Sequence, residues 1–365
     1  MSFSAADHAF MARALALTER GRDTSTPNPN VGCVLVKDGR IIGEGWHARA
    51  GEAHAEVAAL SSAAESPQGA TAYVTLEPCA HQGRTGPCAD KLVEAGIARV
   101  VAALRDPFPA VNGRGLERLC AAGIAAEVGL MEAQAREVHR GFLSRVTRGR
   151  PWMRIKAAAS LDGRTALANG KSQWITSEEA RRDVHALRAR SCAMLTGIGT
   201  VLADDPQLTV RHVPWRRQPR RVLIDNRLEV PPTAKILQGE PPIIFTVSDD
   251  AQKRKRLEAL GAEVFVAHAD AAKAGKTDLA HVARELAAHG FNEVTVETGS
   301  RLNGSLLAAG VVDEIVLYLA PMIIGDSGQG LFALPELQEL DEARRLDIVD
   351  VSPVGPDIRI TARVR

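Results

Sequence analysis

Four residues in the first quarter of the chain have side chains suited to binding a metal ion and moving a proton. His54 stands two positions before Glu56 in "EAHAEVAAL", and Cys79 and Cys88 each follow a proline in "EPCAHQGRTGPCAD". An imidazole and two thiolates are ligand types that zinc prefers, and three protein ligands leave a fourth tetrahedral position for water. Zinc lowers the pKa of such a water to about 7. Glu56 would lie beside the metal without binding it and would transfer the proton.

The order of these residues along the chain strengthens the zinc hypothesis. We expect His54 and Cys88 each to stand at the start of a helix, where the partial positive charge of the helix N-terminus favours a thiolate. His-x-Glu followed by Pro-Cys and a second cysteine is the signature of zinc deaminases, in which the glutamate is the general acid and base. Here eight residues, "AHQGRTGP", separate the cysteines instead of two. The alternative is two structural cysteines and a solvated His/Glu pair.

Composition argues against several classes of protein. The 45 basic and 44 acidic residues give a formal net charge of +1, which argues against a bulk electrostatic hold on nucleic acid. No stretch approaches the roughly 18–20 consecutive apolar residues that span a bilayer, and the N-terminus lacks the basic start and apolar run of a signal peptide. The five cysteines are odd in number and scattered. They argue against a disulfide framework and favour a reducing, cytoplasmic setting.

Hydrophobic periodicity predicts two α/β domains joined by a linker. In the first, apolar runs on either side of Asp38 and Gly39 predict a hairpin, and a helix is expected over about 54–65. The charged segment "RVTRGRPW" lacks apolar periodicity and predicts the linker. A helix with Thr176 or Ser177 as its N-cap is expected after it. Strands are predicted in "WMRIKAAASL", "AMLTGIG", "RRVLID", "PIIFTV", "AEVFVA", "EVTVET" and "EIVLYLAP". We place the domains at 1–146 and 150–365.

The second domain carries weaker chemical signals of its own. In "VETGSRLNGSLL" a strand runs into Gly299 and a helix follows, so free backbone N–H groups there could receive a phosphate. The alternative is a plain strand-to-helix turn. No Gly-Lys-Ser/Thr follows, which argues against an ATP-binding loop. Arg188 and Arg211 carry planar guanidinium groups suited to a phosphate, or they are solvated surface charges. By residue type alone Trp174 is expected in the core, since large aromatic side chains are usually well buried.

Longer motifs in both halves resemble one family. "TPNPNVGCVLVKDGRIIGEGWH", "GEAHAE", "YVTLEPCAHQGRTGPC" and "GRG" resemble the deaminase half of the bifunctional riboflavin-biosynthesis deaminase/reductase, whose pattern includes the widened loop between the cysteines. "KAAASLDGRTA", "SQWIT", "RRDVHALRARS", "TVLADDPQLTVR" and "VETGSRLNGSLL" resemble its reductase half. The resemblance implies an N-terminal cytidine-deaminase-like zinc domain and a C-terminal dihydrofolate-reductase-like domain, with Zn²⁺ and NADPH as cofactors.

The resemblance also implies two consecutive reactions on small pyrimidine ribotides. The first is deamination of 2,5-diamino-6-ribosylamino-4(3H)-pyrimidinone 5′-phosphate, in which Glu56 would carry a proton to the departing ammonia. The second is reduction by NADPH of the ribosyl group of 5-amino-6-(5-phosphoribosylamino)uracil to a ribityl chain. For the hydride step, Lys156, Asp204 and Glu297 remain alternatives as the group that assists. Dimers or tetramers are usual for such folds, so a homo-oligomer is expected; with the composition above, we expect it in the cytoplasm and without nucleic-acid or membrane partners.

Residue by residue, the resemblance assigns binding roles in both halves. Asn28, His47, His81, Arg84 and Asp106 would orient the deaminase substrate. The chain departs from the family's Asp-Pro-Asn-Pro at "DPFP", where Phe108 replaces a polar residue and puts the role of Asp106 in question. The reductase substrate would contact Ser172, Arg188, Leu208, Arg211 and Glu297. The dinucleotide would contact Ala158, Trp174, Thr200, Asp204, Asn226 and the 299–305 loop, formed by Gly299, Ser300, Arg301, Leu302, Asn303, Gly304 and Ser305.

Two other functions would use the same residues. A zinc deaminase acting on a tRNA or nucleoside base, fused to a module that reduces nothing, would keep the metal set. The widened cysteine loop and the second set of motifs argue against it. A zinc-stabilised binding protein would need the cysteines for folding but would not need Glu56.

Overall fold

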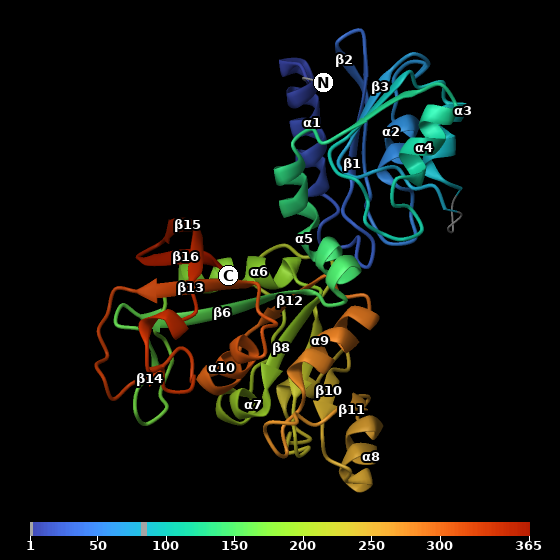
Figure 1. Ribbon diagram of the computed structural model, residues 1–365. Coiled ribbons are helices and arrows are strands. Elements are labelled where there is room, and N and C mark those ends of the chain that lie inside the picture. The colour runs from blue at the N-terminus through green and yellow to red at the C-terminus, as the bar shows by residue number, and fades with distance from the viewer. Residues whose placement is uncertain (1–2, 82–85) are drawn as a thin grey trace. The chain divides into compact units, whose positions relative to one another are not determined.

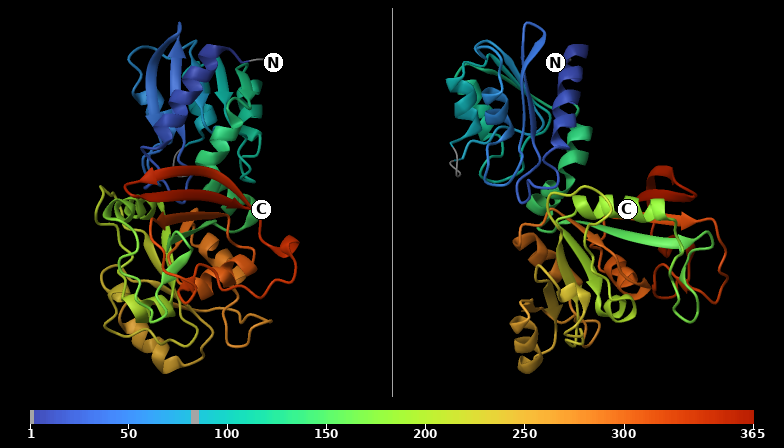
Figure 2. Two further views of the ribbon diagram at one scale, coloured as in Figure 1. Left: turned by 90° about the vertical axis from the view of Figure 1, so that its left-hand side faces the viewer. Right: turned by 180° about the vertical axis from the view of Figure 1, so that it is seen from behind.

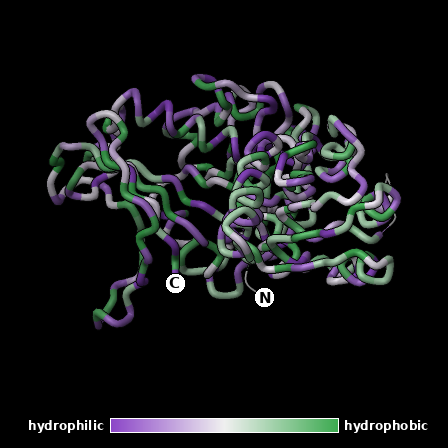
Figure 3. The backbone as a smooth tube through the Cα atoms, turned by 90° about the horizontal axis from the view of Figure 1, so that it is seen from above, coloured by the Kyte–Doolittle hydropathy of each residue, from purple (hydrophilic) through white to green (hydrophobic). Residues whose placement is uncertain are grey.

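The computed structural model describes residues 3–81 and 86–365. The chain divides into two compact units, Met1–Gly149 and Arg150–Arg365, and each contains a sheet with helices packed on it (Figure 1). The predicted α/β class is therefore confirmed for both halves. Along the tube in Figure 3, hydrophobic and hydrophilic residues are interspersed, as expected for elements with one buried face. Among the described residues, none of the helices combines the length and apolar character needed to cross a bilayer.

The first unit is built on a five-stranded sheet in the order β2-β1-β3-β4-β5. Asp38 and Gly39 both have positive φ, 48° and 74°, as a tight hairpin turn requires. This confirms the predicted hairpin of β1 and β2. Strand β3 pairs antiparallel with β1, and β3, β4 and β5 are parallel. The strands are β1 Gly32–Lys37, β2 Arg40–Trp46, β3 Thr71–Val74, β4 Arg99–Ala102 and β5 Ala125–Val128.

Helices cover both faces of this sheet. They are α1 Ala5–Thr18, α2 Ala55–Ser61, α3 Cys88–Glu94, α4 Arg114–Ala121 and α5 Glu132–Arg148. Figure 1 shows α1 and α5 on one face and α2, α3 and α4 on the other. Alternate residues of β1 supply the two cores: Leu35 packs with Leu92 and Leu119, whereas Val34 packs with Met11 and Phe142. The predicted helix over 54–65 is shorter than expected and has His54 as its N-cap.

The second unit is built on a nine-stranded sheet in the order β11-β10-β9-β8-β12-β6-β13-β16-β15. All seven strands predicted for it are present, and they run parallel. The strands β15 and β16, which were not predicted, continue the sheet antiparallel at one edge (Figure 2). The strands are β6 Trp152–Ser160, β8 Ala193–Gly197, β9 Arg220–Ile224, β10 Ile243–Thr246, β11 Glu263–Val266, β12 Glu293–Val296, β13 Glu314–Ala320, β15 Leu346–Val354 and β16 Asp357–Val364. A separate ribbon pairs β7 Arg164–Ala166 with β14 Gln329–Gly330.

The helices of the second unit follow the parallel strands. They are α6 Glu178–Arg190, α7 Ile198–Asp204, α8 Ala251–Ala259, α9 Leu279–Ala288 and α10 Ser300–Ala308, with single turns at Lys235–Leu237 and Leu340–Glu342. The N-cap of α6 is Ser177, whose Oγ accepts a hydrogen bond from the backbone N–H of Ala180 at 3.2 Å. The carboxyl ends of β6, β8, β9 and β12 lie at one edge of the sheet. In open parallel sheets such an edge is where ligands bind.

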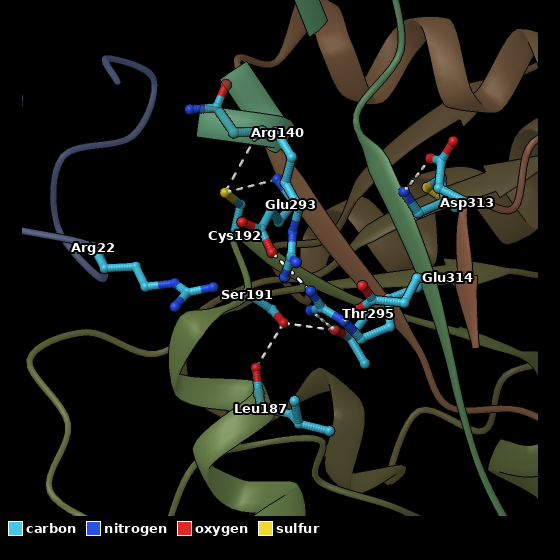
Figure 4. A network of polar contacts seen from close by, with 12 residues as sticks. Arg22, Arg140, Leu187, Ser191, Cys192, Glu293, Thr295, Asp313 and Glu314 are labelled. Atoms are coloured by element: carbon cyan, nitrogen blue, oxygen red, sulfur yellow. Dashed lines mark hydrogen bonds and ion pairs between the residues drawn. The ribbon is translucent and has the colours of Figure 1, made fainter. Parts of the chain in front are cut away.

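A buried ionic network joins three adjacent strands in the middle of this sheet (Figure 4). Arg154 of β6 is almost fully buried and donates to Glu293 of β12, at 2.9 Å, and to Glu314 of β13. It also donates to the hydroxyl of Thr295, which is hydrogen-bonded to Ser191 at 2.7 Å. Burial opposes the charge of Arg154, but the two carboxylates raise the pKa of this guanidinium above its usual value. The network is structural and lies away from the sheet's carboxyl edge.

Candidate functional site

The metal-ligating residues predicted from the sequence converge in the first unit. His54 precedes α2, Cys79 follows β3, and Cys88 is the first residue of α3. His54 Nδ1 lies 3.6 Å from Cys79 Sγ and 3.3 Å from Cys88 Sγ, and the three ligand atoms lie within 4.8 Å of one another. Around a tetrahedral zinc, Zn–N and Zn–S bonds of about 2.0 and 2.3 Å place nitrogen and sulfur roughly 3.6 Å apart. The geometry therefore fits a zinc ion.

The start of helix α3 favours a thiolate at Cys79. The backbone N–H of Cys88 donates to Cys79 Sγ at 3.3 Å. The contacts with Cys88 and His54 lower the pKa of the Cys79 thiol, although its burial acts in the opposite direction. The thiolate is the form of cysteine that binds metals.

Glu56 lies next to this set in the first turn of α2 and is buried. Burial, together with the negative charge of Cys79, raises the pKa of Glu56 to about 7. A carboxyl group with a pKa near neutrality both accepts and donates a proton at physiological pH. The side chain thus has the environment of a general acid and base.

His47 and Asn28 lie together beside His54. The rings of His47 and His54 meet edge to face, with centroids 5.2 Å apart. His47 Nδ1 donates to the carbonyl of Ala53 and its Nε2 accepts from the amide of Asn28, each at 3.0 Å. Burial lowers the pKa of His47, which favours this neutral tautomer. Both predicted residues are therefore adjacent to the metal-ligating set.

Sequence reasoning did not single out Glu77, which organises the neighbouring loop. Its carboxylate is buried and accepts hydrogen bonds from the backbone N–H groups of Asp106, Gly113, Gly115 and Leu116, at 3.2, 3.0, 2.9 and 3.4 Å. A Cβ on Gly115 would lie 2.0 Å from the carbonyl oxygen of Pro78, so the start of α4 approaches the Pro-Cys segment closely. The available signal was an acidic residue directly before Pro78 and Cys79.

Asp106 and Phe108 occupy the loop that Glu77 holds. Asp106 is buried, and burial raises its pKa to about 6, with the charges of Glu77 and Cys79 adding to the shift. Its Oδ1 accepts from the backbone N–H of Phe108 at 2.8 Å. The ring of Phe108 packs edge-on against His81, with centroids 5.9 Å apart. Phe108, the residue that departs from the family pattern, thus makes an aromatic contact with His81. Arg84 lies outside the described residues.

A second cluster of charged groups lies at the carboxyl edge of the sheet in the other unit. The guanidinium of Arg188, on α6, binds both oxygens of Glu297, just after β12, at 2.6 and 2.9 Å. Lys156 Nζ, on β6, lies 3.9 Å from the same carboxylate. Burial lowers the pKa of Lys156, and Arg188 lowers it further. The structure therefore brings together three residues predicted for the reductase.

Comparison with known proteins identifies both halves. Residues 4–104 match the model of the cytidine and deoxycytidylate deaminase zinc-binding region, and residues 151–360 match that of the RibD C-terminal domain. The chain is 48% identical to the riboflavin biosynthesis protein RibD of Escherichia coli, covering 96% of this chain and 98% of the relative, and 40% identical to that of Aquifex aeolicus, covering 97% of each. The chain belongs to the RibD family.

Solved RibD structures extend the agreement over the whole chain. The structure of RibD from Acinetobacter baumannii superposes with a TM-score of 0.91 at 41% identity and covers 99% of both chains. A deaminase/reductase from Thermotoga maritima superposes with a TM-score of 0.88 at 34% identity, also over 99% of both chains. As a RibD-family protein, this chain is a bifunctional deaminase and reductase of riboflavin biosynthesis. Its first unit contains the zinc-binding deaminase domain.

The remaining reductase residues that the RibD resemblance implied occupy several environments. Leu208 is buried, Arg211 lies three residues later, and Ser172 is half-buried in the loop before α6. Trp174 is 68% exposed, and the guanidinium of Arg181 lies 4.6 Å from the centroid of its ring. The expectation that Trp174 is a core residue is therefore wrong.

The residues predicted for the dinucleotide lie on β6 or after β6, β8, β9 and β12 of the RibD reductase sheet. Ala158 lies on β6, Asp204 is exposed at the end of α7, and Thr200 Oγ1 lies 3.3 Å from Thr298 Oγ1. Asn226 Oδ1, after β9, accepts from the N–H and the hydroxyl of Thr277 at 2.9 and 2.6 Å. Thr298 was not predicted, although it directly precedes the glycine that was.

The segment 299–305, predicted as a loop, is instead the N-cap and the first turns of helix α10; it is open at its beginning and packed at its end. Gly299 is the N-cap of α10, and a Cβ there would meet no atom within 4 Å. A Cβ on Gly304 would lie 2.1 Å from the carbonyl oxygen of Ala333, and Asn303 is buried. The side chain of Leu302 packs against Gly197. Ligand access is therefore greatest at Gly299, Ser300 and Arg301, where the free N–H groups suit a phosphate.

Proposed function

We propose that the first unit deaminates 2,5-diamino-6-ribosylamino-4(3H)-pyrimidinone 5′-phosphate. We further propose that the second reduces the ribosyl group of 5-amino-6-(5-phosphoribosylamino)uracil with NADPH. The observation that carries the proposal is the convergence of His54, Cys79 and Cys88 beside the buried Glu56. The Thermotoga maritima relative bears the name of a diaminohydroxyphosphoribosylaminopyrimidine deaminase/5-amino-6-(5-phosphoribosylamino)uracil reductase. The proposed domains are 1–146 and 150–365.

In the deaminase, His54, Cys79 and Cys88 would hold zinc, which supplies an activated water when bound. Glu56 accepts a proton from the water that adds to the amine-bearing ring carbon, and delivers it to the nitrogen that leaves as ammonia. Its pKa of about 7 suits both steps. The hydrogen-bonded pair of Asn28 and His47 orients the base, and Asp106 and Arg84 complete the substrate contacts.

In the reductase, NADPH would supply the hydride, and the chain's own groups bind the sugar phosphate and move a proton. Arg188 and Arg211 bind the substrate with Ser172, Leu208 and Glu297. Of the alternatives for the assisting group, the Lys156–Glu297 pair is half-buried, whereas Asp204 is exposed. Lys156, whose pKa is lowered by burial, donates the proton to the ring oxygen as the hydride reaches C1′. The open N-terminus of α10 and the residues on β6 or after β6, β8 and β9 hold the dinucleotide.

The assembled enzyme is proposed to be a cytoplasmic homo-oligomer that acts on small molecules. Strand β15 is an edge strand of nine residues. It exposes Ile348, Val349 and Val351, each more than half accessible. An exposed apolar edge strand favours pairing with another chain, and a second copy would cover it. All five cysteines are free, which is compatible with a reducing compartment.

An assay on the purified full-length chain tests the proposal. With the diaminopyrimidine ribotide and NADPH, we expect one ammonia released and one NADPH oxidised per substrate. With tRNA or cytidine in its place, we expect neither. Ammonia release from RNA without NADPH oxidation would support the base-editing alternative and overturn the assignment.

A further inference from the structure

Two residues of helix α6 hold the segment 207–211, which carries Arg211. The guanidinium of Arg188 donates through Nη1 to the carbonyl oxygen of Thr209 at 3.0 Å. One turn earlier on the helix, His185 Nδ1 accepts a hydrogen bond from the backbone N–H of Arg211 at 3.2 Å. The helix side chains therefore hold the backbone of the segment on both sides of Val210.

The rest of the segment is held just as tightly. Gln218 accepts from the N–H of Val210 at 2.7 Å and donates to its carbonyl at 3.0 Å. Leu208 is buried with a positive φ of 53°. The Arg211 guanidinium donates to Gln207 Oε1 and Thr209 Oγ1, both at 2.9 Å. These contacts hold the backbone of the segment in place. The guanidinium of Arg211 lies on its solvent-exposed side.

The bond from Arg211 requires a neutral ring at His185, because a protonated Nδ1 has no lone pair to accept it. The charged and titratable groups around the ring are Arg188, Arg211, His212 and Glu297. The ring of His212 meets that of His185 edge to face, with centroids 4.7 Å apart. Burial and then the two arginines lower the pKa of His185 to about 4, against a smaller opposing effect of Glu297. The acceptor is therefore present throughout the neutral range.

We propose that His185 is a positioning residue for the phosphate subsite of the reductase: its Nδ1 fixes the backbone of Arg211, and so directs the guanidinium toward the phosphate of the sugar substrate. The inference rests on the proposed function, in which Arg211 binds that phosphate. It adds a residue that does not itself touch the substrate. Its role follows from the hydrogen bond to the backbone and from its place on the same helix face as Arg188.

The test compares two variants that differ at the δ position of one side chain. His185→Leu fills a similar volume without an acceptor, whereas His185→Asn places an amide oxygen where Nδ1 lies. NADPH oxidation is measured with the 5′-phosphorylated substrate and with its dephosphorylated form. We expect His185→Leu to raise the KM for the phosphorylated substrate about three- to tenfold, which is the effect of one lost hydrogen bond. The kcat should change little, and His185→Asn should recover most of the loss.

Two controls separate this inference from the proposed function. Arg211→Gln should raise the same KM by more than His185→Leu does; if it has no effect, the assignment of the phosphate to Arg211 is wrong. Ammonia release by the deaminase half reports on the folding of the rest of the chain and should not change. His185→Ala is a second acceptor-free variant and should behave like His185→Leu.

Three results would overturn the role of His185 while leaving that of Arg211 intact. The first is a wild-type KM in both acceptor-free variants. The second is an equal loss in His185→Asn and His185→Leu. The third is an equal loss with the phosphorylated and the dephosphorylated substrate, which would indicate a general structural role.

Discussion

The guanidinium of Arg188 binds both carboxylate oxygens of Glu297, and this pair fastens helix α6 to the end of strand β12. Lys156 approaches the same carboxylate from β6. Burial alone would raise the pKa of Glu297, but Arg188 and Lys156 outweigh it and lower the pKa to about 2. The carboxylate of Glu297 is thus the counter-charge of both Arg188 and Lys156 in the proposed reductase site.

Replacing Glu297 with glutamine should impair the reductase specifically. The variant keeps the shape but leaves Arg188 and Lys156 without their counter-charge, and removing one partner of an ion pair that is largely shielded from water is costly. We expect kcat/KM for NADPH oxidation to fall about tenfold or more. Loss of the carboxylate should also lower the pKa of Lys156 and shift the basic limb of the pH–rate profile to lower pH. Ammonia release is the internal control. A wild-type rate across the whole pH profile would remove Glu297 from the site.

Replacing Glu77 with glutamine should weaken the deaminase without removing its metal. In the wild type, both carboxylate oxygens accept hydrogen bonds from backbone N–H groups. The glutamine amide keeps one acceptor oxygen, but its NH₂ group would face backbone donors and leave them without an acceptor. We expect the first unit to lose about 1–3 kcal/mol of stability and ammonia release to slow. Thermal unfolding and activity are compared with Glu117→Gln, an exposed residue on α4. Equal behaviour of the two variants would contradict a role for Glu77 in holding the loop.

The metal-ligating set was predictable because its members are distinctive side chains with a defined order along the chain. The hairpin was predictable because Asp38 and Gly39 suit positive φ. Glu77 and His185 were not, because their partners are backbone N–H groups, 36 residues away at Gly113 and 26 residues away at Arg211. Backbone amides are the same at every residue and leave no sequence signal. Strands β15 and β16 were also missed, since much of β15 is exposed and its apolar residues mark no buried face.

The buried His139 should make the stability of the first unit depend on pH. Its Nε2 lies 3.2 Å from the hydroxyl of Thr75, and burial lowers its pKa from 6.5 to about 4. Between these values the unfolded chain binds the proton and the folded chain does not. The contribution of His139 to stability is therefore full above about pH 6.5 and is lost as pH falls toward 4, by up to about 3 kcal/mol.

Unfolding measured from pH 7 to pH 4.5 checks this prediction. In His139→Leu, the stability of the first unit should decline much less with falling pH than in the wild type. In His8→Gln, at an exposed position on α1, the decline should be the same as in the wild type. An unchanged pH dependence in His139→Leu would show that other groups cause the decline.

Replacing Glu56 with alanine distinguishes catalysis from a structural zinc site. The variant should fold, keep its metal and oxidise NADPH with the deaminated substrate, because none of the three ligands changes. It should release ammonia at least a hundredfold more slowly, the usual loss when a general acid and base is removed. Deamination at the wild-type rate would show that a group other than Glu56 carries the proton.

The metal content of the full-length chain tests the central claim most directly. Elemental analysis of the purified protein should find one zinc per chain in the wild type and in Glu56→Ala. Cys79→Ser should hold much less than one, with ammonia release lost in parallel. A zinc-free wild-type chain that deaminates the ribotide at full rate, or a Cys79→Ser chain with undiminished zinc, would contradict the account.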